Sequence, residues 1–226
     1  MNQEETFAWV EQLLPEPLEV DTYRVGESFP EFAAASVALG GDGTAAPETV
    51  AMSLDAGRIE VGLEAEPGTE VRVEFVTVAA GHDDLAPNLV AAAATMVSQD
   101  PGVWTPQPGT VMRGLGDHVR EGLSARHGLL IVPFLWEKGV PQVHEIAGDG
   151  GDGAKKADQI GEDGPVSDKG FDYTHPGRLT VPAQLVMITD FELEILDRAA
   201  EEGRNGVDEL QNYLVEQQVN INDLMR

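Results

Sequence analysis

Two dense apolar runs in the last hundred residues constrain the fold most strongly. The first run is HGLLIVPFLWEKG at residues 127–139, and the second is RLTVPAQLVMI at residues 178–188. Residues 129–135 are apolar at successive positions, a pattern typical of a central strand that is covered on both faces. Phe134 is therefore expected in the core. Pro182 cannot donate a ladder hydrogen bond, which places the second run at a sheet edge or at a bulge.

A capped helix is predicted directly after the second run. Thr189 and Glu192 have the spacing of a capping box, in which each side chain accepts a hydrogen bond from the backbone N–H of the other residue. Gly203 is expected to end this helix, and Asn205-Gly206 to turn the chain. A last helix is indicated by the apolar spacing of Val207, Leu210 and Leu214.

Two further helices are predicted in the first half of the chain. Residues 4–14 have helical apolar spacing, and Pro15 follows them. The second helix begins after the turn at residues 82–84, and Pro87 lies in its first turn, where a missing N–H costs nothing. Residues 100–102, Asp-Pro-Gly, end it. Its alanine run favours close packing against a sheet.

A β region is predicted between these two helices. Residues 18–39 indicate a buried strand or turn. Three later segments alternate between apolar and polar residues, with turn sequences at 55–57 and 66–68. An antiparallel meander is therefore expected. The alternating segments are residues 49–55, 57–64 and 70–78.

The composition changes sharply at residues 148–170, which are rich in glycine and aspartate. Such a segment buries too little apolar surface to offset its ordering entropy, so a flexible loop is predicted. The GDGGDG sequence at 148–153 matches a dinucleotide-binding pattern only formally, because its aspartates would repel a pyrophosphate and no long amphipathic helix follows. No cofactor is expected.

The net charge is the second strong constraint on function. Forty acidic residues against fourteen basic ones give −26 at pH 7. Such a field repels nucleic acid and anionic membranes and speeds encounter with a cationic partner. General adaptation for solubility is the other explanation of the charge, and composition does not separate the two explanations. The absence of cysteine excludes disulfides and thiolate chemistry. No secretory signal or membrane span is recognised, so a cytoplasmic location is expected.

Enzyme signatures are lacking. The five histidines form no metal-binding pair, and the serines lack the glycine pattern of a nucleophile elbow. No catalytic residue and no metal ligand are therefore predicted, and a non-catalytic role is expected. Trp9, Trp104 and Trp136 are the tryptophans that could line a groove. A hydrolase or ligand-binding enzyme that uses acidic residues near Trp104 or Trp136 is the alternative.

Several of these segments, taken in order, resemble the suppressor-of-fused family, in particular its bacterial branch. The resemblance covers residues 71–226. It rests on a strand and helix at 71–94, on Trp104 with the Pro-Gly turn at 108–111, and on three C-terminal motifs. These motifs are PFLWE at 133–137, MITDFE at 187–192 and DLMR at 223–226.

The resemblance implies both a fold and a role. It implies a single domain over residues 1–226 of the α+β class, with a mostly antiparallel mixed sheet flanked by helices. It also implies a protein-binding module, and bacterial relatives suggest an immunity protein that sequesters a basic toxin. A housekeeping scaffold is a third possibility. Trp104, Trp136 and Glu137 are the predicted partner-contact residues, and the oligomeric state stays undetermined.

Overall fold

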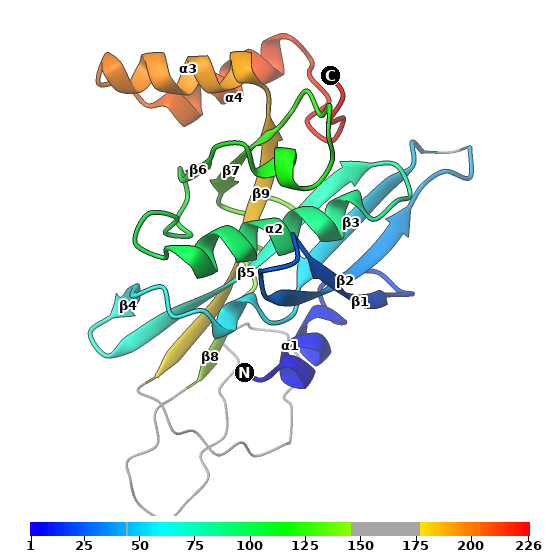
Figure 1. Ribbon diagram of the computed structural model, residues 1–226, viewed down its shortest axis with the longest axis vertical. Helices are drawn as coiled ribbons and strands as arrows, with labels where there is room; N and C mark the ends of the chain where they lie inside the picture. Colours follow the sequence, from blue (N-terminus) through cyan, green and yellow to red (C-terminus); the bar gives the residue numbers. More distant parts are fainter. Residues whose placement is uncertain (44, 146–176) are drawn as a thin grey trace, which may run out of the picture.

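The structure is a computed structural model that describes residues 1–43, 45–145 and 177–226. Within these ranges the chain forms one nine-stranded sheet, four α-helices and two short 3-10 helices (Figure 1). This confirms the α+β class. The predicted flexible loop at 148–170 lies outside the described residues.

The sheet is mixed and mostly antiparallel, as predicted. Its order is β1-β2-β3-β5-β9-β7-β6, with β4 beside β5 and β8 beside β9. All of these pairs are antiparallel except β5 with β9, which is parallel. The strands are β1 (Glu19–Arg24), β2 (Glu31–Leu39), β3 (Glu48–Ser53), β4 (Glu64–Glu66), β5 (Thr69–Ala80), β6 (Val111–Met112), β7 (His127–Ile131), β8 (Val143–Glu145) and β9 (Arg178–Ile188).

Strand β9 lies in the middle of the sheet, so the edge or bulge predicted from Pro182 is wrong. β9 pairs with β5 in continuous parallel register over residues 178–184. On its other side, pairing with β8 ends at Thr180 and pairing with β7 begins at Gln184. Pro182 lies between these two short strands, where no strand on that side requires its N–H. A central strand therefore accommodates a proline.

The meander is formed only in part. β1, β2, β3 and β5 pair antiparallel in sequence order, and β4 joins β5 through a tight turn at Pro67-Gly68. The strand predicted at 57–64 is wrong, because residues 56–58 form the 3-10 helix η1 (Ala56–Arg58). The reason is the buried carboxylate of Glu74, which accepts hydrogen bonds from the N–H groups of Ala56 and Gly57. These donors therefore bind a side chain and not a neighbouring strand.

The predicted helices are present. The first ends at Val10, earlier than its apolar spacing indicates, and a capping box of Asn2 and Glu5 begins it. The predicted box of Thr189 and Glu192 is formed, with N–H to oxygen distances of 2.7 Å and 3.2 Å. The helices are α1 (Gln3–Val10), α2 (Leu85–Gln99), η2 (Leu115–His118), α3 (Asp190–Glu201) and α4 (Gly206–Glu216).

The core is divided between the two faces of the sheet. Successive strand residues point to opposite faces, and neighbouring residues of one strand indeed belong to different apolar clusters. Ala34 and Phe75 pack with α2, whereas Ala35 and Val76 pack with α1. A third cluster holds α3 and α4 against β7 and β9 at the C-terminal end of β9 (Figure 1). Its strand residues alternate with those that pack with α2, so these helices lie on the face opposite α2.

The C-terminal residues are bound tightly to this framework. The Arg226 guanidinium donates to Glu192 Oε2 at 2.8 Å, to the Met187 carbonyl at 2.7 Å and to the Asp223 carbonyl at 2.8 Å. The side chains of Arg226 and Glu192 are only 11% and 4% exposed. Two of the C-terminal motifs, MITDFE and DLMR, are thus joined by one buried ion pair. Their function in this chain is structural.

Candidate partner-binding site

The chain leaves the sheet after β7 and displays two apolar side chains to solvent. Val132 is 58% exposed and Phe134 is 59% exposed. The strand predicted over residues 129–135 therefore ends at Ile131, and the prediction that Phe134 belongs to the core is wrong. Pro133, between the two exposed residues, lacks the N–H that a continued strand would use. We call residues 132–140 the display segment.

The display segment is held at its start by a buried glutamine. The Phe134 N–H donates to Gln184 Oε1 at 3.1 Å. Gln184 lies on β9 at the end of its pairing with β7, and its side chain is buried. A buried amide needs hydrogen-bond partners, so this contact fixes the backbone at the point where the Phe134 side chain points away from the sheet.

The segment is held at its centre by Trp136. The Trp136 indole N–H donates to the Leu13 carbonyl at 3.1 Å, and the half-buried ring packs beside the α1 cluster. Glu137 follows and is exposed. Trp136 is thus an anchor, and Phe134 and Glu137 are the groups available to a partner on either side of it.

Trp104 does not join this site. It is half-buried and packs with the α2 cluster, on the opposite face of the sheet from Trp136. Two of the three predicted contact residues, Trp136 and Glu137, therefore share one segment, and Trp104 lies elsewhere. Val132, Phe134 and Gln184 were not predicted as contact residues. The signal available for Gln184 was a single amide within the apolar stretch at residues 181–188.

Most acidic residues stay uncompensated, because they far outnumber the basic residues and several of the arginines already pair with an acidic neighbour. Exposed glutamates Glu11 and Glu16 flank, in sequence, Leu13, whose carbonyl accepts from Trp136. The paired arginines include Arg24 with Glu31, Arg113 with Asp197, Arg120 with Asp83, Arg126 with Asp190, and Arg204 with Glu202.

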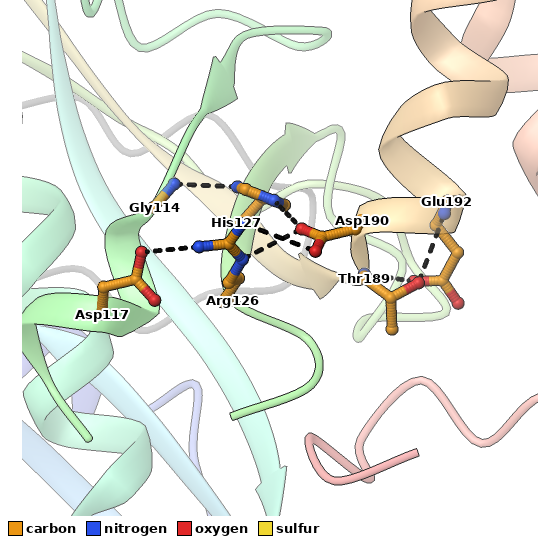
Figure 2. Close-up of polar contacts among 7 residues, drawn as sticks. All are labelled: Gly114, Asp117, Arg126, His127, Thr189, Asp190 and Glu192. Atoms are coloured by element: carbon orange, nitrogen blue, oxygen red, sulfur yellow. Dashed lines mark hydrogen bonds and ion pairs between the residues drawn. The ribbon is translucent and has the colours of Figure 1, made fainter. Parts of the chain in front are cut away.

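A polar cluster outside the display segment, shown in Figure 2, involves His127 at the start of β7. Its Nδ1 accepts the Gly114 N–H at 2.8 Å, and its Nε2 therefore carries the proton that is donated to Asp190 Oδ1 at 2.7 Å. Arg126 bridges Asp190 and Asp117. The Arg126 guanidinium, and then His127, hold the pKa of Asp190 below its usual range. Both ring nitrogens are occupied, so this histidine serves to join β7 to α3.

Neither metal-binding geometry nor a membrane span is found in the described parts of the chain. Among those residues, no group of three or more His, Asp or Glu side chains could hold a metal ion. No described helix has both the length and the apolar character needed to cross a bilayer.

The fold is one mixed, mostly antiparallel sheet with α2 on one face and α1, α3 and α4 on the other. This fold is similar to that of a crystal structure from Neisseria gonorrhoeae, provisionally described as a SUFU (suppressor of fused protein) homolog. The two share 15% identity and a TM-score of 0.57, covering 99% of this chain and 94% of that chain. At this identity the likeness shows the fold alone. No protein-family model and no curated protein match the sequence.

Proposed function

We propose that the protein is a non-catalytic binding module of the suppressor-of-fused type, and that the display segment contacts its partner. The observation that carries the proposal is the exposed Phe134, whose backbone is fixed by buried Gln184. An aromatic side chain held in place on the surface offers contact area at low entropic cost, which is typical of the residues that dominate protein interfaces.

The charge favours a basic partner. The chain carries −26, Glu137 lies in the display segment, and Glu11 and Glu16 are close in sequence to Leu13, which Trp136 contacts. Complementary charge raises association rates and selects against acidic competitors. We further propose that the partner is a basic toxin and that the protein acts as its immunity protein, as the resemblance to bacterial relatives suggests.

Phe134→Ala is expected to weaken the complex by at least about tenfold, because it removes the main apolar contact. The free energy of unfolding should change by less than about 1 kcal/mol, since the side chain is mostly exposed. Partners captured from the native host by tagged wild-type protein would first be identified by mass spectrometry, and each purified partner would then be titrated by calorimetry.

Phe29→Ala is the matched control, because Phe29 is another exposed aromatic residue and lies outside the display segment. Its complex should keep wild-type affinity. A basic partner whose association slows steeply with salt supports sequestration by charge. Equal affinities for the wild type and Phe134→Ala would remove the display segment from the interface, and an acidic partner would contradict the proposed role of the charge.

The alternative of a hydrolase that uses acidic residues near Trp104 or Trp136 has weaker support. Both tryptophans pack beside apolar clusters on opposite faces of the sheet, and Trp136 already uses its indole N–H on Leu13. This alternative predicts that Glu137→Gln abolishes a turnover activity without changing stability, whereas the binding proposal predicts weaker association with a basic partner.

A further inference from the structure

A cavity of about 370 Å³ lies between the start of α1, the 3-10 helix η1 and the first halves of β5 and β9. It is separate from the display segment, none of whose residues line it. The volume is within the range of small-molecule sites. Its charged lining residues include Asp55, Arg58, Glu60, Arg72, Glu74 and Arg178.

Arg72 is the unusual member of this lining. Its side chain is 6% exposed, and Nη2 donates to Glu70 Oε2 at 2.7 Å. Its Nε is buried without a hydrogen-bond partner among the described residues. An unpaired buried donor on a charged group carries a large desolvation cost, and such groups often mark a missing ligand, ion or water.

A second guanidinium extends the same site. Arg178 on β9 is paired with Glu70 on β5 in the sheet register, and its Nε donates to the same Glu70 oxygen at 3.3 Å. One carboxylate is therefore shared by two guanidinium groups, each with five N–H donors. Donors are left over for an oxyanion. Buried Thr180 also lines the cavity.

Acceptors are present at the same cavity. Asp55 pairs with Arg58 at 2.8 Å, and exposed Glu60 lies 3.8 Å from Arg72. Burial raises the pKa of Glu74 to about 8, so this carboxyl adds little negative charge at neutral pH. Arg58, Arg72 and Arg178 then balance Asp55, Glu60 and Glu70.

We propose that this cavity binds a small zwitterion of amino-acid size. Its carboxylate accepts hydrogen bonds from Arg72 and Arg178, because a guanidinium matches carboxylate geometry. Its ammonium group pairs with Glu60, because both Asp55 oxygens already accept hydrogen bonds from Ala33 and Arg58. A planar monoanion fits better than inorganic phosphate, because a second negative charge would be repelled by Glu60, Glu70 and Asp55.

The test is binding of free amino acids to the full chain. Each of the standard amino acids, at about 10 mM, is screened by thermal shift, and binders are titrated by calorimetry. Acetate, ethanolamine, inorganic phosphate and sodium chloride at equal ionic strength are the comparison probes. A ligand at about 100 times its Kd stabilises the folded state by about 2.7 kcal/mol. At least one amino acid should raise the melting temperature above all four comparison probes.

Two variants locate the binding. Arg178→Gln and Glu60→Gln should each weaken binding by about tenfold or more while the protein stays folded, since both side chains are at least partly exposed. Arg24→Gln, which alters an exposed arginine paired with Glu31 outside the cavity, should bind like the wild type.

Three results would overturn the proposal: no amino acid surpassing the salt and acetate shifts, phosphate binding more tightly than any amino acid, or unchanged affinity in both cavity variants. Phe134→Ala should leave amino-acid binding intact, so the outcome here is independent of the partner-binding proposal.

Discussion

Arg226→Ala is expected to lower the free energy of unfolding by about 3–5 kcal/mol, because it leaves Glu192 as an uncompensated buried charge. In the variant, Glu192 keeps the N–H of Thr189 as a partner and loses the guanidinium. The carbonyls of Met187 and Asp223 lose their donor as well. Urea unfolding followed by tryptophan fluorescence measures the difference at pH 7.

Arg198→Ala is the control for this prediction, because Arg198 is an exposed arginine in the last turn of α3. Its loss should cost at most about 1 kcal/mol through the helix dipole. If Arg226→Ala cost no more than Arg198→Ala, the ion pair with Glu192 would not be the contact that secures the C-terminal residues to the framework.

Glu74→Gln is expected to destabilise the protein by about 2–3 kcal/mol at pH 5, because the new amide NH₂ group would face another hydrogen-bond donor. Glu74 Oε2 accepts from Ala56 N–H at 3.1 Å, Oε1 accepts from Gly57 N–H at 2.9 Å, and the Ser53 hydroxyl lies 2.5 Å from Oε2. An amide has only one oxygen, so its NH₂ group must face one of these backbone N–H groups. Each buried donor left unsatisfied costs roughly 1–3 kcal/mol.

The destabilisation by Glu74→Gln should shrink as the pH rises and give way, near pH 8, to a variant more stable than the wild type, because the wild type loses about 3–4 kcal/mol between pH 5 and pH 8. Burial raises the pKa of Glu74 to about 8 from 4.5 in the unfolded chain. A carboxyl with a raised folded pKa contributes its full stability below the unfolded pKa, and that contribution is lost as the pH rises toward 8. The wild type therefore loses stability between about pH 5 and pH 8 at up to about 1.4 kcal/mol per pH unit from this group.

The difference in unfolding free energy between the wild type and Glu74→Gln reports on Glu74 alone, because all other titrating groups are common to both proteins. Unfolding free energies at pH 5, 6, 7 and 8 give this difference directly. A constant difference across the series would show that the Glu74 carboxyl has an ordinary pKa and that its hydrogen bonds offset its burial.

Sequence patterns correctly predicted the helices and turns that depend only on residues close to one another in the chain. The capping box of Thr189 and Glu192, the helix after residues 82–84 and the turn at Pro67-Gly68 follow from neighbouring residues, and all are present. The α+β class followed from the resemblance. Pro182 misled because its position in the sheet depends on where two other strands end.

The candidate site was predictable only in part for the same reason. Apolar residues at 129–135 indicate burial, but the end of β7 at Ile131 follows from Pro133 and from the Gln184 amide, which lies far along the chain. Trp136 and Glu137 were found through a motif. The cavity escaped prediction, because Arg72 and Arg178 become neighbours only through the parallel pairing of β5 with β9.

That parallel pairing also has a consequence for how the chain folds as it is synthesised. Glu70 and Arg178 are 108 residues apart, and β9 pairs with residues 70–76 of β5. While the ribosome makes the intervening residues, β1, β2, β3 and β5 are complete but one edge of β5 is unpaired. Contacts of such long range slow folding, and an open strand edge invites aggregation. The nascent N-terminal half should therefore depend on chaperones until β9 emerges.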